Sequence, residues 1–248
     1  MRYFKILVLL LVSNSVFCQF GKEMNYGFFA GGLSSKITQL DDMIVPPGVF
    51  SNYNLEIKPK YGFLIGGFLN VKYPEKNVSV QADLYFSKEG SDLLYDDILG
   101  LNYKLKFNYT YLNVGLLFKY YVTNGFYIGS GPYLGLNLNK DNLEYTSNSS
   151  QLNSANSVIF EPDAVVQKVL KESFEGNDYF FVKFGTGYEF ENHLTVGFNY
   201  NLGITDAVKT NNNGFRYTER LNKLSGFSLN IGYSFEFDDT KNFENNLK

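Results

Sequence analysis

The chain is short of the residues on which most protein chemistry relies. Its 248 residues include one histidine, one cysteine and no tryptophan. Transition metals bind mainly through imidazole and thiolate groups, so the sequence excludes a metal site built from several such ligands. Basic residues are also scarce, since 22 Lys and Arg stand against 25 Asp and Glu. Binding of nucleic acid needs clustered cations, so we expect neither a nucleic acid partner nor a bound cofactor.

Long apolar runs are lacking as well. After residues 1–18 no segment is apolar for 18 or more residues, so we expect no helix that crosses a membrane. Residues 1–18 carry Arg2 and Lys5 before a short apolar run, which is typical of a secretory signal peptide, and we predict cleavage after Cys18. The alternative is a lipoprotein signal that keeps Cys18, but bulky Phe17 stands where such signals favour a small residue.

Aromatic residues are abundant, with 20 Tyr and 24 Phe, and these residues favour β-strands. Apolar and polar residues alternate with a period of two, which is typical of strands. The alternation predicts eight strands, near 26–33, 61–73, 78–86, 111–121, 126–138, 179–190, 194–204 and 227–237. We therefore predict an all-β domain over residues 19–237, an eight-stranded antiparallel up-and-down β-barrel, followed by a polar tail over 238–248.

One strand has a break in this pattern. Between residues 103 and 121 the apolar side chains occupy odd positions up to Tyr109 and even positions from Leu112 onward. Two explanations stay open. Either a β-bulge shifts the phase, or the strand rises out of the membrane zone.

The predicted connections alternate in length. Short turns are expected at 74–77, 122–125 and 191–193, and long connections at about 34–60, 87–102, 139–178 and 205–225. Short turns at one end and long loops at the other match the periplasmic and extracellular ends of an outer-membrane barrel. The pattern therefore predicts a transmembrane barrel in the outer membrane of a Gram-negative bacterium.

A soluble lipocalin-like barrel also alternates, with its bulky face turned inward. The two faces of the predicted strands differ in a way that favours the membrane. One face holds Phe, Leu, Val, Ile and Tyr with almost no charge, as contact with hydrocarbon requires. The other is rich in small residues that suit a narrow interior, among them Gly115, Gly129, Gly131, Gly135, Gly185, Gly187, Gly197, Gly203 and Gly232.

Several segments resemble the PorT-like outer-membrane β-barrel family of Bacteroidetes-type bacteria. They are 81–90 (QADLYFSKEG), 111–121 (YLNVGLLFKYY), 129–135 (GSGPYLG) and 199–205 (NYNLGIT). The likeness runs over roughly residues 25–237. It implies an outer-membrane location and no single activity, although the family's namesake is tied to a protein-secretion apparatus. Two departures are Asp83, where the family more often has Glu, and the tail after Phe237.

Few residues are candidates for catalysis. His193 is the only histidine and falls in a short predicted turn, where an exposed turn residue is the simpler interpretation. The acidic pairs Asp41-Asp42 and Asp96-Asp97 lie in predicted long loops. A calcium loop needs six or more oxygens at set spacing, which neither pair supplies. We therefore expect no catalytic site and no metal site.

A set of ionisable residues falls on the predicted inner face. Buried charges must be paired, because an isolated one is very costly. We interpret the set as an internal polar plug that closes the pore, with a proton or ion path as the alternative. Its members are Lys72, Asp83, Lys119, Lys183, Glu189 and Glu236.

The long connection 139–178 contains a short predicted helix at 161–174, with Pro162 near its start and apolar residues at helical spacing. It would cap its own barrel or dock a partner, and we favour capping. The whole sequence predicts a monomeric barrel with a structural or interaction role, in contact with outer-membrane lipid and with envelope or secretion proteins. The alternatives are a narrow channel, an envelope-modifying enzyme and a soluble lipocalin-like carrier.

Overall fold

The computed structural model describes residues 23–40, 53–98, 100–155, 160–210 and 222–236. The predicted signal peptide 1–18 with its cleavage site at Cys18, the pair Asp41-Asp42 and the tail 238–248 lie outside these ranges. All the main strands are antiparallel. The all-β antiparallel architecture predicted from the alternation is therefore confirmed.

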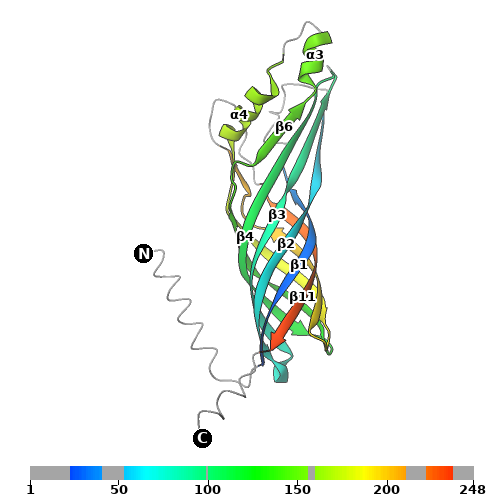
Figure 1. Cartoon of the computed structure of the whole chain (residues 1–248), viewed down its shortest axis with the longest axis vertical. Coiled ribbons are helices and arrows are strands. Elements are labelled where there is room, and N and C mark those ends of the chain that lie inside the picture. The colour runs from blue at the N-terminus through cyan, green and yellow to red at the C-terminus, as the bar shows by residue number, and fades with distance from the viewer. Residues whose placement is uncertain (1–22, 41–52, 99, 156–159, 211–221, 237–248) are drawn as a thin grey trace, which may run out of the picture.

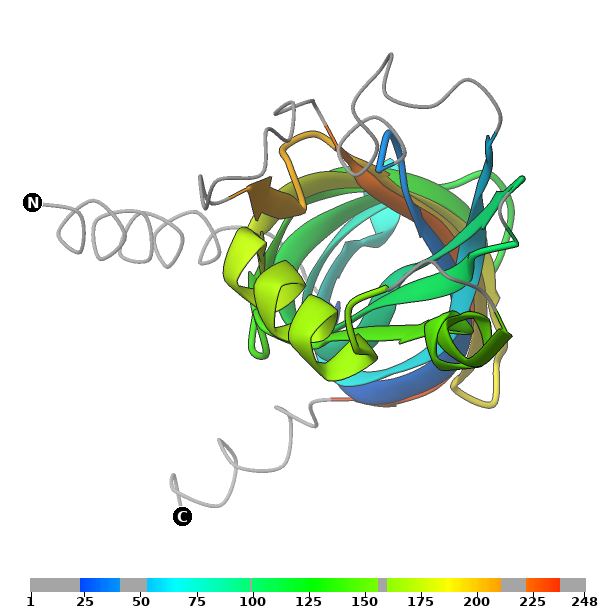
Figure 2. The same ribbon diagram turned by 90° about the horizontal axis from the view of Figure 1, so that it is seen from above.

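Eight long strands form one closed ring. They are β1 (Glu23–Ile37), β2 (Tyr53–Tyr73), β3 (Val78–Asp97), β4 (Asn102–Tyr121), β5 (Phe126–Asn137), β8 (Tyr179–Glu189), β9 (Leu194–Gly203) and β11 (Leu224–Glu236). Each strand pairs with its neighbour in the ring, and β1 closes the circle by pairing with β11. Figure 2 shows this ring from above. The number of strands equals the number that the alternation predicts.

Further short elements lie beyond the ring and were not all expected. β6 (Leu143–Ser147) extends the sheet beside the upper part of β4, and β7 (Phe174–Gly176) pairs with β10 (Val208–Thr210). Two helices, α3 (Ser149–Ala155) and α4 (Asp163–Ser173), lie above the ring (Figure 1). Among the described residues, no helix is both long and apolar enough to cross a membrane. α4 lies within the segment 161–174 in which a helix was expected.

Three short connections lie at one end of the ring, formed by residues 74–77, 122–125 and 190–193 (Figure 1). The first contains the 3-10 turn η1 (Pro74–Lys76). Each connection reverses the chain with one residue of positive φ: Asn77 at 53°, Gly125 at 85° and His193 at 68°. Asn and Gly tolerate this left-handed conformation better than most residues, which explains why these turns are tight.

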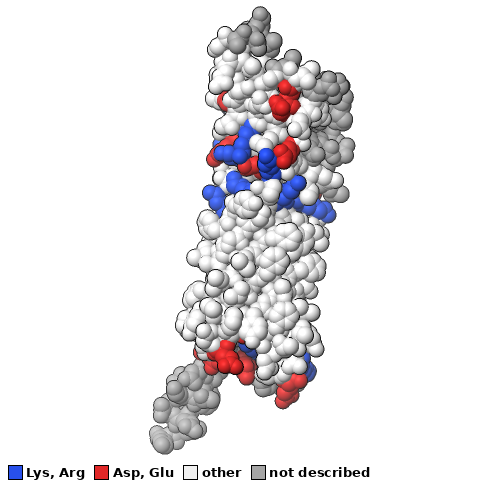
Figure 3. Space-filling model, turned by 90° about the vertical axis from the view of Figure 1, so that its right-hand side faces the viewer, with Lys and Arg blue, Asp and Glu red and all other residues white. Residues whose placement is uncertain are grey.

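Between the charged groups at the lower end and a band of charged groups higher up, the outer surface in view is uncharged, and we call it the apolar belt (Figure 3). Its side chains point away from the interior at alternate positions of every strand, as a period of two requires. Its exposed members include Phe28, Tyr61, Phe63, Ile65, Leu84, Phe86, Val114, Leu116, Phe118, Ile128, Phe184, Phe198, Phe227, Leu229 and Ile231. Since the bulky face points outward, the interpretation as a soluble carrier is wrong.

Three adjacent strands rise far above the others. β2, β3 and β4 have 21, 20 and 20 residues, whereas β9 has 10 and β8 has 11. We call the protruding part the upper wall, and it comprises residues 53–60, 87–97 and 102–111 with β6 beside them. Four tyrosines meet across its inner side. Tyr53 stacks on Tyr95 and Tyr95 on Tyr103, with ring centroids 5.9 and 4.5 Å apart, and Tyr103 contacts the tilted ring of Tyr145 at 5.4 Å. Such cross-strand aromatic pairs stabilise a sheet that protrudes from its ring.

The break in the pattern of residues 103–121 has a clear cause. The pairing of β3 with β4 runs without a register shift from Val78 and Tyr120 to Asp96 and Asn102, so β4 contains no bulge against β3. The bulge is in β2, between Pro59 and Leu64. In β4 the apolar residues simply change sides, because the strand leaves the apolar belt and enters the upper wall.

Candidate functional site

The interior of the ring is the strongest candidate for a functional site. Glycines on the inner face leave room for tyrosine rings from neighbouring strands. A Cβ at Gly115 would lie 2.3 Å from the ring of Tyr133, and one at Gly135 would lie 2.4 Å from the ring of Tyr179. Both tyrosines are almost fully buried, so their rings fill part of the interior.

A lower ion cluster lies near the end with the short turns. The Nζ of Lys72 lies 2.6 Å from Oε2 of Glu189, and the Nζ of Lys119 lies 2.8 Å from Oε1 of the same carboxylate. Tyr121 donates its hydroxyl to Glu189 at 3.0 Å. Lys119 also lies over the ring of Tyr127, 4.2 Å from its centroid. One carboxylate is thus held by two lysines from β2 and β4.

A middle ion cluster lies deeper inside. The Nζ of Lys183 lies 3.1 Å from Oδ2 of Asp83, which also accepts a hydrogen bond of 2.6 Å from the Tyr133 hydroxyl. Gln81 donates to the other oxygen of Asp83 at 2.6 Å. Lys183 lies over the rings of Tyr133 and Tyr85, with its Nζ 4.0 and 4.5 Å from their centroids. Every group of this cluster is buried, and the charges are paired as buried charges must be.

The sequence reasoning missed one interior carboxylate. Glu89 is buried and accepts hydrogen bonds from Ser87 at 2.5 Å and from Tyr179 at 3.1 Å, while Asn113 donates to Ser87 at 2.7 Å. The alternation predicts a long connection from residue 87 onward, but β3 continues to Asp97. The alternation from Ser79 through Asp83, extended at the same period, would have placed Glu89 on the inner face.

The predicted plug residues do not all meet. Lys72, Lys119 and Glu189 come together in the lower ion cluster, and Asp83 and Lys183 in the middle one. Glu236 is in neither. It follows the inward phase of β11 and is paired with Asn25 of β1, but it is the last residue of that strand and 75% of its side chain is exposed at the rim. Its Oε1 lies 3.9 Å from Nδ1 of His193.

A small void lies among the described side chains of the middle ion cluster. The enclosed void beside Asp83, Lys183 and Asn199 measures about 20 Å³, which is enough for roughly one water molecule. Three lysines and three carboxylates line the described interior, so its formal charges balance. All three carboxylates are engaged by hydrogen bonds or ion pairs.

An apolar core closes the ring above these clusters. It is formed by buried side chains of the strands and of the elements above them, among them Ile37, Leu93, Leu105, Phe107, Leu143, Leu170, Phe174, Val208 and Leu224. α4 contributes Leu170 and packs against β6 and β7. The helix therefore packs on the structure of its own chain, at one side of the rim (Figure 2).

Asp163 fastens α4 to β6. The backbone N–H of Ser147 donates to its carboxylate at 2.8 Å, and the hydroxyl of Ser149 donates at 3.1 Å. Partial burial alone would raise the pKa of Asp163, but the hydrogen bonds from Ser147 and Ser149 outweigh it and hold that pKa below its usual range. The charged form of Asp163 is therefore the form that stabilises this junction.

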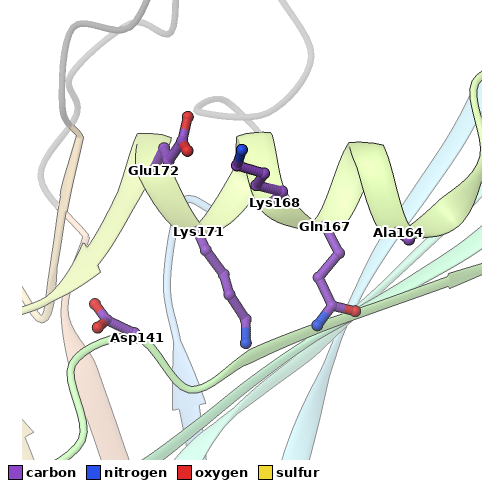
Figure 4. Close-up of a pocket in the computed structure, with 6 residues that line it drawn as sticks. All are labelled: Asp141, Ala164, Gln167, Lys168, Lys171 and Glu172. Carbon is purple, nitrogen blue, oxygen red and sulfur yellow. The ribbon is translucent and has the colours of Figure 1, made fainter.

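The other candidates for chemistry do not assemble. His193 is exposed in its tight turn, and Asp97 accepts hydrogen bonds from the backbone of Leu101 and from Tyr95, which stabilises the turn after β3. Beside α4 lies an open hollow of about 560 Å³ lined by residues of mixed charge that are exposed or half-exposed (Figure 4). Within the described ranges, no group of three or more His, Cys, Asp or Glu side chains is placed to hold a metal ion.

Comparison with known proteins gives the family. Residues 14–209 match the family described as "Outer membrane protein beta-barrel domain", and the chain belongs to this family. The outer membrane is therefore its location. No curated protein is similar in sequence to the chain.

Solved structures with a similar arrangement include three outer-membrane proteins. Ail, the attachment invasion locus protein of Yersinia pestis, is 14% identical with a TM-score of 0.37, over 86% of this chain and 99% of that one. OprG from Pseudomonas aeruginosa is 13% identical with a TM-score of 0.39, over 88% and 98%. The outer membrane protease OmpT from Escherichia coli is 11% identical with a TM-score of 0.30, over 87% and 96%. Family membership rests on the match over residues 14–209.

Proposed function

We propose that this member of the outer membrane protein beta-barrel domain family is a closed, non-conducting barrel with a structural or interaction role and no catalysis. The observation that carries the proposal is the filled interior. Two ion clusters lie across the interior, and the enclosed void beside the middle ion cluster holds about one water molecule. An eight-stranded ring is only wide enough for side chains, which agrees with such a plug.

The proposal includes an orientation. The short turns face the periplasm, and the upper wall with α3, α4 and β6 faces the exterior, as in other barrels of this kind. Export through the signal peptide 1–18 of a Gram-negative cell and a link to protein secretion or envelope assembly, as the PorT-like resemblance implies, belong to the same proposal. The presented surface is then the upper wall, which is held together by its own apolar core.

Conductance in planar lipid bilayers tests the closed barrel. We expect no current above the membrane background from the purified, refolded protein. The matched variant Lys183→Ser/Asp83→Ser removes the middle ion cluster and widens the interior. Equal heat-modifiable gel mobility of this variant and the wild type serves as the control for failure to insert. Steady unitary currents from the wild-type protein would refute the proposal.

The alternative of a narrow ion path has one observation in its favour. A hollow of about 560 Å³ opens at the short-turn end and reaches Glu189 and Lys72 of the lower ion cluster. An ion path along this line would need Glu189, so Glu189→Gln would alter any current that the wild type carries. A silent trace from both proteins would remove the alternative.

The orientation is tested separately by protease accessibility on intact cells. A specific protease site inserted in the connection after β5, beside Asn139, is expected to be cut from outside, whereas the same site inserted at 122–125 is protected until the outer membrane is opened. The reverse result would contradict the proposed orientation and would leave the proposal of a closed interior unaffected.

The absence of catalysis is tested with the variant His193→Ala, which is expected to leave every envelope phenotype unchanged.

A further inference from the structure

Five lysines gather on the outer side of the tall strands, directly above the apolar belt. We call them the lysine patch, and its members are Lys58, Lys60, Lys88, Lys104 and Lys106. In the sheet, Lys106 of β4 is paired with Asp92 of β3, and Asp92 is paired in turn with Lys58 of β2. Figure 3 shows basic side chains as a band at the upper margin of the uncharged surface.

Carboxylates within the band balance only part of this charge. Asp92 serves two lysines, with Lys104 at 2.6 Å and Lys60 at 4.0 Å. Glu144 pairs with Lys106 at 3.4 Å, and Glu56 with Lys58 at 3.3 Å. Five lysines against three carboxylates leave two positive charges in excess.

Lys88 differs from the other four lysines. In the part of the chain that the structure describes, its side chain has no ion-pair partner. It lies two residues beyond Phe86 on the same face of β3, and two residues of a strand span about 7 Å. Lys88 is therefore the cation nearest to the apolar belt on this strand.

The lysines of the patch lie on three adjacent strands, β2, β3 and β4. Among the other strands of the ring, β5, β9 and β11 contain no Lys or Arg, and the single lysine of β8, Lys183, points into the interior. β1, which pairs with β2, carries one exposed lysine, Lys36. General attraction to headgroups would be served by cations around the whole circumference. The lysines of the patch, which lie on adjacent strands, instead form a local site that is large enough for one or two anionic groups.

An apolar surface continues directly below the patch. Tyr61, Phe63 and Phe86 are 80%, 56% and 48% exposed, and they belong to the same two strands as Lys60 and Lys88. A ligand that fits both surfaces has a negatively charged head and hydrocarbon chains beneath it. Lysine ammonium groups bind phosphate as point charges, and cations near a membrane surface attract anionic lipids.

We propose that the lysine patch binds the phosphate group of an anionic lipid in the membrane leaflet nearest to the long connections. The acyl chains of this lipid lie along Tyr61, Phe63 and Phe86, and the phosphate lies between Lys60 and Lys88. The proposal goes beyond the closed-barrel role and is independent of it, because it requires only that the apolar belt is embedded in lipid.

Native mass spectrometry of the full protein in uncharged detergent tests the site. The probes are dioleoyl phosphatidic acid and dioleoylglycerol, which share acyl chains and differ in the phosphate, together with inorganic phosphate, which lacks the chains. We expect phosphatidic acid to be retained at concentrations at least about tenfold lower than dioleoylglycerol, since each cation near a lipid surface contributes about a fivefold gain in affinity.

The decisive variant is Lys60→Gln/Lys88→Gln, which should weaken retention of phosphatidic acid about 10- to 30-fold. The control Lys168→Gln/Lys171→Gln removes the same charge from α4 and should leave retention unchanged. If the first double variant does not fold, Lys88→Gln alone replaces it, since no ion pair is lost. Equal retention by the two double variants would overturn the proposal, and so would displacement of the lipid by an equal concentration of inorganic phosphate.

Discussion

The two halves of β4 show opposite patterns on one uninterrupted strand. In the lower half, Leu116 and Phe118 point outward and Lys119 points inward to Glu189. In the upper half, Lys106 is on the outer side and Phe107 is fully buried on the inner side. The pairing with β3 keeps one register throughout, so the backbone does not cause the reversal. The surroundings of each half decide which side chains face outward.

The reversal follows from what surrounds each region. The outer surface of the apolar belt contacts hydrocarbon, so charges are confined to the interior, where they must pair with one another. The upper wall stands in water, so its stability depends on burying an apolar face against β6, α4 and the neighbouring loops. One half of β4 therefore has its apolar side chains outward, as in a membrane protein, and the other half has them inward, as in a soluble protein.

The largest effect is expected from breaking the interior of the lower region. Lys183→Met leaves the Asp83 carboxylate buried without its cation, and we expect a loss of about 3–5 kcal/mol in the free energy of unfolding. Urea unfolding of the protein refolded into lipid bilayers measures this loss. The double variant Lys183→Met/Asp83→Leu removes both charges and should recover most of it. A double variant as unstable as the single one would show that the ion pair is not the cause.

A smaller effect compares the outer faces of the two regions on β3. Leu84 and Asp96 lie on the same side of this strand, one in the apolar belt and the other in the upper wall. Leu84→Arg is expected to cost about 2–4 kcal/mol, because it places a charge against hydrocarbon, whereas Asp96→Arg should cost less than about 0.5 kcal/mol. The same unfolding measurement compares the two. Equal costs would mean that the belt is not embedded in lipid.

The smallest effect concerns the junction of α4 with the upper wall. Because the folded pKa of Asp163 is lowered, its contribution is present at neutral pH and is lost as the pH falls through that folded value. Asp163→Asn should cost about 1 kcal/mol at neutral pH after allowance for solvent screening, and it should make the junction insensitive to acid. Hydrogen exchange of the amides in α4 measures this, with Glu161→Gln as the control of equal charge. Unchanged exchange in Asp163→Asn would contradict the assignment.

Much of the ring could be predicted because its pattern is local. A period of two along a strand, the short turns and the eight apolar segments are visible in neighbouring residues, and so is the outward direction of the bulky face. The ion pairs of Glu189 with Lys72 and Lys119 are non-local. The sequence could place all three residues on the inner face, but only the register along β2, β3, β4, β5 and β8 decides at what height each one lies.

The misplaced and missed residues have the same origin. Glu236 has the inward phase but is exposed at the last position of the ring, and Glu89 lies inside because β3 continues beyond the expected end of the strand. Phase is a property of the sequence, whereas height along the barrel depends on the lengths of all the strands together. The side on which α4 packs also depends on the upper core, to which distant segments contribute.

The interior of the ring depends both on the sequence pattern of each strand and on the tertiary structure. By itself, the sequence determined that the chain forms an all-β ring with an apolar exterior, because alternation forces one face of each strand to be bulky and the other small. The tertiary structure decided which interior charges neutralise one another, where the apolar face turns inward, and that five lysines meet on one side. These depend on distances between strands, which pairing and register fix and which no single segment encodes.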